Sequence, residues 1–97
     1  MKLGNASSAG TLESNDISIR LEPNDENIIK ISLESIVEKQ YGKQIKKVIE
    51  DTLRKLNIEN AVVNAVDKGA LDCVIKARIE TAVMRACNDF KFNWEEE

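Results

Sequence analysis

Hydrophobic and polar residues alternate with a period of two in two stretches near the start of the chain. Residues 17–22 read ISIRLE, and residues 29–33 read IKISL. This period is typical of a β-strand that packs one face against a core. The turn-forming cluster PNDEN at 23–27 separates the two stretches. The pattern therefore predicts two strands that pair as an antiparallel hairpin.

Hydrophobic residues then recur at steps of three and four, the period of an amphipathic helix. From Val37 to Leu56 the pattern predicts one helix, with Ser35 and Glu38 as a capping box and Asn57 as its left-handed end. A second pattern of this kind runs over residues 70–86, and Asn88 is suited to close that helix.

Between the helices, AVVNAV at 61–66 is short and β-branched, which predicts a third strand. Asp67-Lys68-Gly69 follows as a turn in which Gly69 adopts a demanding backbone angle. The order strand, strand, helix, strand, helix predicts an α+β fold: a small, mostly antiparallel sheet with two amphipathic helices on one face. An extra short N-terminal strand, around residues 9–12, stays open.

The length of 97 residues indicates a single domain over residues 1–97. Hydrophobic residues make up 42% of the chain and charged residues 32%, which is the balance of a globular protein. Residues 1–8 are expected to be flexible, and residues 88–97 to form a C-terminal tail. The aromatic residues of this tail either pack back on the sheet or contact a partner, and both readings stay open.

The formal net charge of −3, without any concentration of Lys and Arg, argues against nucleic acid as a partner. No apolar run has the length of a signal sequence or a membrane span, so we expect a cytoplasmic protein with no membrane contact. Cys73 and Cys87 are expected as small buried side chains in a reducing compartment, too far apart along one helix to form a disulfide.

The chain contains no histidine, which removes His-dependent nucleophiles and His-ligated metal sites. We therefore expect neither catalytic residues nor metal ligands. Ser14, between Glu13 and the pair Asn15-Asp16, lies on a polar turn where another enzyme has access to its hydroxyl. From the residues alone, two alternatives stay open: Ser14 shapes the turn by bonding to its own backbone, or other N-terminal serines, at 7 and 8, are the modified ones.

Four segments carry a more specific pattern: AGTLESND at 9–16, ISIRLEP at 17–23, VEKQYG at 37–42 and DKGALDC at 67–73. Together they resemble the acyl carrier protein of citrate lyase, the gamma subunit of that complex. The resemblance implies that Ser14 carries 2'-(5''-phosphoribosyl)-3'-dephospho-coenzyme A through a phosphodiester bond. It also gives Glu13, Asn15 and Asp16 a place in recognition around the attachment site.

The resemblance implies three partners: the alpha subunit (citrate CoA-transferase), the beta subunit (citryl lyase) and the prosthetic-group transferase. The arm would carry acetyl and citryl thioesters between the two catalytic subunits while citrate is cleaved to oxaloacetate and acetate, and this chain would be non-catalytic. The alternatives are the acyl carrier of a malonate decarboxylase-type complex and a small α+β interaction module without a prosthetic group. A stand-alone enzyme using Glu13 and Asp16 as bases ranks third.

Overall fold

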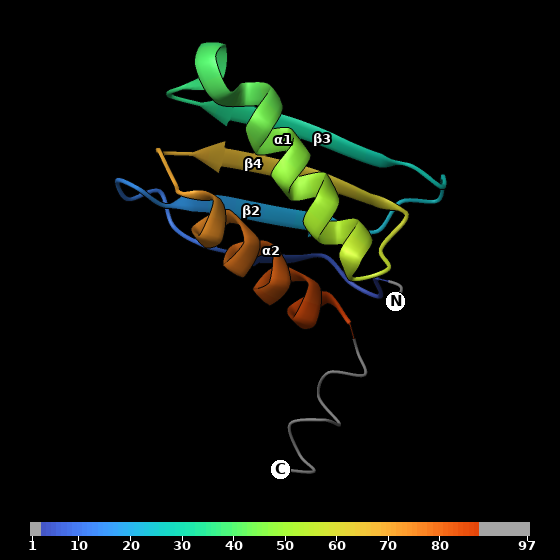
Figure 1. The fold of residues 1–97 in the computed structure, drawn as a ribbon. Coiled ribbons are helices and arrows are strands. Elements are labelled where there is room, and N and C mark those ends of the chain that lie inside the picture. The colour runs from blue at the N-terminus through green and yellow to red at the C-terminus, as the bar shows by residue number, and fades with distance from the viewer. Residues whose placement is uncertain (1–2, 88–97) are drawn as a thin grey trace.

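A four-stranded sheet with two helices on one of its faces makes up residues 3–87, the part of the chain that the computed structural model describes (Figure 1). The elements in chain order are β1 (Ser7–Ala9), β2 (Ile17–Glu22), β3 (Ile29–Ser35), α1 (Glu38–Lys55), β4 (Ala61–Asp67) and α2 (Asp72–Ala86). The predicted α+β fold, with both helices on one face, is confirmed. Within this part of the chain, neither helix combines the length and apolar character needed to cross a membrane.

The strand order is β1-β2-β4-β3, so β4 lies between the two strands that were expected to form a hairpin. β2 pairs antiparallel with β4, whereas β3 pairs parallel with β4. The predicted hairpin is therefore wrong, and the sheet is mixed. Because β4 lies between β2 and β3, the connection at 23–28 must span about 10 Å, the distance between alternate strands of a sheet, and it is long enough to do so. α1 supplies the long crossover that the parallel pair β3 and β4 requires.

The short additional strand that the sequence left open is β1, slightly earlier in the chain than expected. It pairs antiparallel with β2 and forms one edge of the sheet. Leu3 ahead of it is buried, and the amide of Gly4 donates to the carbonyl of Ala86 at 3.0 Å. Residues 3–8, part of the segment expected to be flexible, thus have defined contacts. The rest of that segment, and the tail 88–97, lie outside the described residues.

The alternation within each strand divides the sheet into a face covered by helices and a polar face. The sheet contributes to the core the buried residues Ile17, Ile19, Leu21, Ala61, Val63 and Ala65. The helices contribute Ile45, Ile49, Leu53, Ile75, Ile79 and Val83. Complete burial of such an aliphatic side chain stabilises the fold by about 1.5–3 kcal/mol. In this chain, with 4% aromatic residues, the buried core is aliphatic.

The C-terminal end of α1 follows the sequence prediction. Asn57 has a φ of 61°, and its amide donates to the carbonyl of Arg54 at 3.0 Å. The amide of Ile58 donates to the carbonyl of Leu53 at 2.9 Å. These two bonds form a Schellman motif, which needs a left-handed residue where the helix stops.

The N-terminal end of α1 differs from the prediction. Val37 occupies the N-cap and makes no side-chain capping bond, so the capping box of Ser35 and Glu38 is not formed. Ser35 is instead the last residue of β3, and its hydroxyl donates to Asp67 Oδ2 at 2.8 Å. The buried carboxylate of Asp67 engages the hydroxyl that the sequence had assigned to the helix start.

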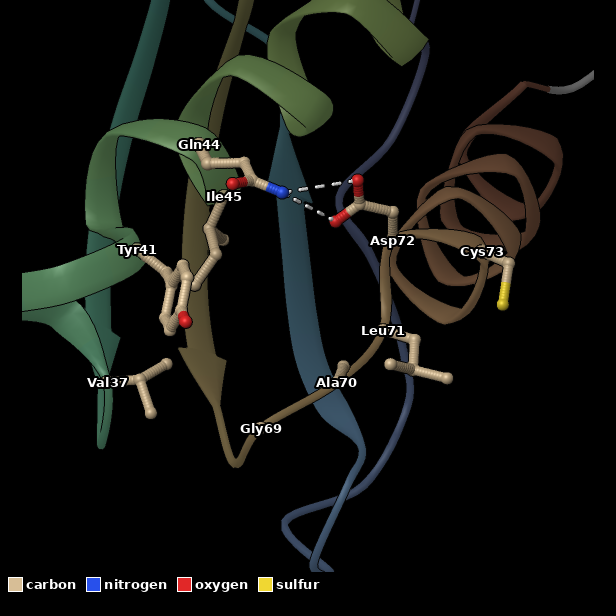
Figure 2. A pocket seen from close by; sticks show the side chains of 9 residues that line it. All are labelled: Val37, Tyr41, Gln44, Ile45, Gly69, Ala70, Leu71, Asp72 and Cys73. Atoms are coloured by element: carbon tan, nitrogen blue, oxygen red, sulfur yellow. Dashed lines mark hydrogen bonds between the residues drawn. The ribbon is translucent and has the colours of Figure 1, made fainter.

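α2 begins at Asp72, two residues after the predicted start, and ends at Ala86 as predicted. Asn88, proposed to close it, lies outside the described residues. Of the two cysteines, Cys87 is buried and Cys73 is exposed, so the expectation of burial is wrong for Cys73. The reason is its place in the first turn of α2, where Figure 2 shows the thiol turned away from α1.

Candidate functional site

Ser14 lies at the tip of a tight turn in the connection between β1 and β2. The amide of Asp16 donates to the carbonyl of Glu13 at 3.2 Å, which closes a β-turn around Ser14 and Asn15. Asn15 has a φ of 66°, in the left-handed region that asparagine tolerates better than most residues. The Ser14 side chain is exposed, and its hydroxyl has no hydrogen-bond partner among residues 3–87. The backbone therefore shapes the turn and leaves the hydroxyl accessible.

The turn is joined to the connection between β4 and α2. The amide of Asn15 donates to the carbonyl of Lys68 at 2.8 Å, and the amide of Lys68 donates to the carbonyl of Asp16 at 2.9 Å. Gly69 follows with a φ of 92°, which confirms the demanding angle predicted for it. The Ser14 turn thus packs directly against the residues that lead into α2.

A bidentate ion pair holds the turn from the side of α2. Arg78 donates through Nε to Asp16 Oδ1 at 3.0 Å and through Nη2 to Asp16 Oδ2 at 2.8 Å. The same carboxylate accepts bonds from the Thr11 hydroxyl and the Ile17 amide, each at 2.7 Å. These contacts, first of all the Arg78 guanidinium, hold the pKa of Asp16 well below its ordinary value. The pKa of Arg78 is raised by the carboxylate.

A second carboxylate joins the other connections at this end of the sheet. Asp67, 1% exposed, accepts the Ser35 hydroxyl through Oδ2 and the Ala70 amide through Oδ1 at 2.9 Å. It therefore links the end of β3 to the segment before α2. Asp16 thus holds the Ser14 turn against α2, while Asp67 joins the end of β3 to the segment before α2.

The four residues singled out in the sequence lie together on one turn but differ in exposure. Glu13, Ser14 and Asn15 are exposed, whereas Asp16 is buried and its carboxylate is fully engaged. The geometry gives Asp16 a role in positioning the turn. The competing serines lie elsewhere: Ser7 and Ser8 are part of β1, and the Ser7 hydroxyl donates to the carbonyl of Ala82 at 2.6 Å.

Arg78 was not among the site residues predicted from the sequence. One signal was present: Arg78 follows Val74 by four residues and Ile75 by three, which places it beside the hydrophobic stripe of α2. Its partner, however, is 62 residues away in the chain. No spacing rule connects positions so distant.

A groove of about 600 Å³ opens next to this turn, between the first turns of α1 and α2 (Figure 2). Val37, Tyr41 and Ile45 form the wall on α1, and Leu71 contributes on the opposite side. Tyr41 is 51% exposed. Gln44 Nε2 approaches the two carboxylate oxygens of Asp72 across the groove at 3.5 and 3.4 Å. The groove therefore combines apolar walls with an amide and a carboxylate.

Several known proteins are similar to this chain in sequence. The family model described as "ACP: Malonate decarboxylase delta subunit (MdcD)" matches residues 5–86. The citrate lyase acyl carrier protein of Lacticaseibacillus casei is 55% identical over 99% of this chain and 94% of its own. The citrate lyase acyl carrier protein of Streptococcus mutans is 56% identical over 91% of this chain and 86% of its own. The one of Vibrio cholerae is 46% identical over 99% of this chain and 98% of its own.

A solved structure shares the fold. One chain in the crystal structure of a Pseudomonas malonate decarboxylase hetero-tetramer in complex with malonate aligns with a TM-score of 0.72. The alignment covers 90% of this chain and 89% of that one, at 17% sequence identity. At this level of identity the likeness concerns the arrangement of strands and helices only.

Proposed function

Since the chain belongs to the family of citrate lyase acyl carrier proteins, we propose that Ser14 is the residue to which its prosthetic group is covalently attached. The observation that carries the proposal is the exposed Ser14 hydroxyl, unpartnered among the described residues, at the tip of a turn held from two sides. Formation of a phosphodiester at this oxygen costs no hydrogen bond and displaces no buried side chain. The site therefore fits the group that acyl carriers of this kind need.

We propose 2'-(5''-phosphoribosyl)-3'-dephospho-coenzyme A as the group. When bound, it supplies a terminal thiol that holds the acyl group as a thioester. Arg78 and Thr11 fix Asp16 and so hold the turn in one conformation before the modifying enzyme arrives, which lowers the entropy cost of recognition. Glu13 and Asn15, exposed on either side of Ser14, are the side chains that the prosthetic-group transferase would contact first.

The chain itself would be non-catalytic, a single acyl-carrier domain over residues 1–97. Its partners would be the alpha subunit, a citrate CoA-transferase, and the beta subunit, a citryl lyase. By holding the acyl group on a tether, the chain would raise its effective concentration at both active sites. We place the complex in the cytoplasm, a reducing compartment in which an exposed thiol such as that of Cys73 persists.

The test is mass spectrometry of protein taken from cells that make active citrate lyase. The tryptic peptide from Leu3 to Arg20 holds Ser14 together with other serines, so fragmentation must localise the adduct. We expect the adduct on wild-type protein and on the control Ser8→Ala, and its absence from Ser14→Ala. The Tm of Ser14→Ala should stay within about 4 °C of wild type, since exposed substitutions change stability by about 0.5 kcal/mol or less. Bare Ser14 in active cells, or an adduct retained by Ser14→Ala, would refute the assignment.

A malonate decarboxylase-type complex is the second candidate, because the matching family model carries that description. Reconstitution separates the two. The loaded carrier is added to citrate lyase alpha and beta subunits, and in parallel to malonate decarboxylase lacking its own carrier. We expect citrate cleavage to be restored, whereas restoration of malonate decarboxylation alone would favour the second candidate.

A further inference from the structure

We propose that the groove between the first turns of α1 and α2 is a binding site for the adenine base of the nucleotide attached at Ser14. This inference rests on the attachment proposed above and adds a site to it. The base would lie against Tyr41, and Gln44 and Asp72 would contact its polar edge (Figure 2).

The position of the groove suits the first part of the arm. The Asn15 amide is 2.8 Å from the carbonyl of Lys68, and Gly69, the next residue, lines the groove. Standard backbone geometry then places Ser14 Cα no more than about 8 Å from the Gly69 nitrogen. In the proposed group a phosphate and two ribose rings separate the serine oxygen from the base. The adenine base is the one large planar group of the arm, and its short connection to the serine oxygen keeps it close to the groove.

The walls suit a planar apolar ligand. Tyr41 is 51% exposed on the first turn of α1, and Val37 and Ile45 flank it along the same wall. Leu71, 70% exposed, stands on the other side. Aromatic rings bind nucleobases by stacking, and pockets of about 300–1,000 Å³ are typical of small ligands. The groove, at about 600 Å³, has room for a purine and its ribose.

The polar pair suits the edge of adenine in particular. Amide side chains contact adenine at its 6-amino group and a ring nitrogen. Here the Asp72 carboxylate would accept from the 6-amino group, and Gln44 Nε2 would donate to a ring nitrogen. The bonds from Gln44 to Asp72, at 3.4–3.5 Å, are at the long limit for hydrogen bonds and exchange easily for bonds to a ligand. The negative charge of Asp72 would repel a phosphate, so the groove favours the base over the pyrophosphate of the same arm.

This arrangement leaves the acyl-bearing end of the arm free. With the base held on the carrier, only the pantetheine portion moves, and the volume that the thiol searches becomes smaller. A smaller search volume raises the effective concentration of the acyl group at a docked active site.

The test uses the full chain, made without modifying enzymes and labelled with ¹⁵N, titrated with free 3'-dephospho-coenzyme A and observed by amide NMR. We expect saturable shifts at residues 37–45 and 69–73, the same shifts with AMP, and none with pantetheine. Tyr41→Phe keeps the ring and should bind as wild type, whereas Tyr41→Ala should bind at least about tenfold more weakly. Met84→Ala, an exposed apolar residue at the far end of α2, is the matched control and should bind normally. IMP, whose 6-oxygen faces the Asp72 carboxylate, should bind more weakly than AMP.

Several results would overturn the inference: no shifts in the groove, equal shifts with pantetheine, or equal affinity of wild type and Tyr41→Ala. Chemical shifts in the groove that change with protein concentration would assign the groove to a second copy of the chain and overturn the inference. Chemical shifts in the groove that change on removal of residues 88–97 would assign it to the chain's own tail and overturn the inference as well. A failure of the proposed nucleotide site can be distinguished from a failure of the proposed attachment at Ser14. An adduct on Ser14 with an unperturbed groove would overturn the nucleotide site alone, whereas bare Ser14 in active cells would overturn the attachment.

Discussion

Removal of the Arg78 side chain tests the claim that the Ser14 turn is held by tertiary contacts. In Arg78→Ala the Asp16 carboxylate loses two hydrogen bonds, of 3.0 and 2.8 Å, and its only cation among the described residues. The bonds from Thr11 and Ile17 remain. The carboxylate would then be left largely buried with half of its hydrogen bonds.

The magnitude follows from the exposure of the pair. The side chain of Asp16 is 12% exposed and that of Arg78 38% exposed, which places the pair between a surface and a buried ion pair. Hydrogen bonds to charged groups contribute about 1.5–3 kcal/mol, and solvent at the guanidinium reduces this. We expect Arg78→Ala to lower the free energy of unfolding by about 1.5–2.5 kcal/mol. For a domain of this size the Tm would fall by about 10 °C.

The assay is urea denaturation at 25 °C between pH 7 and pH 2. Because the pKa of Asp16 is lowered in the folded state, its ionised form stabilises the fold above about pH 4 and loses this effect as the pH falls further. The difference in the free energy of unfolding between wild type and Arg78→Ala should therefore become smaller below pH 4. Arg54→Ala is the matched control: its pair with Glu50, at 2.9 Å, has side chains 56% and 44% exposed, and its loss should cost under about 1 kcal/mol.

Two outcomes would contradict this reasoning. One is a stability of Arg78→Ala within about 0.5 kcal/mol of wild type at pH 7. The other is a destabilisation of the same size at pH 2 and pH 7, which would mean that Arg78 contributes by packing and not through the Asp16 charge.

Two further substitutions test the backbone and the buried carboxylate of this region. In urea denaturation, Gly10→Ala should lower the free energy of unfolding by at least about 2 kcal/mol, because Gly10 has a φ of 96° and an added Cβ would overlap the Ile17 carbonyl. The control Gly42→Ala, within α1, should leave this free energy unchanged or raise it. Equal effects of the two substitutions would refute the argument. Asp67→Ala leaves the Ser35 hydroxyl and the Ala70 amide without their acceptor, so it should lower the free energy of unfolding by about 2–4 kcal/mol. Asp67→Asn, which keeps one oxygen, should recover part of this loss, and a wild-type stability of Asp67→Ala would argue against any role of Asp67 in joining the loops.

Much of the fold was predictable because it depends on neighbours in the chain. The period of two over residues 17–22 and the period of three and four over α1 are local properties, and both elements formed where they were expected. The left-handed end of α1 at Asn57 and the turn at Gly69 follow from the chemistry of single residues. The exposure of Ser14 on a polar turn also follows from its immediate surroundings.

The neighbours of each strand were not predictable in this way. β2 and β3 have compatible patterns and a turn-forming segment between them, so a hairpin was the simplest local solution. Packing instead inserted β4 between them, with α1 as the crossover. Ser35 illustrates the same point on a smaller scale, since its hydroxyl binds Asp67, 32 residues away, and not the helix that follows it.

The sequence by itself therefore determined the types of the elements, the exposure of the Ser14 hydroxyl on a polar turn, and the absence of histidine chemistry from this chain. Only the tertiary structure decided that Asp16 is held by Arg78 and that the Ser14 turn packs on the segment before α2. It also decided that a groove opens beside that turn. The physical reason is range: periodicity and turn chemistry act over a few residues, whereas ion pairs, buried carboxylates and grooves depend on residues that the fold alone brings together.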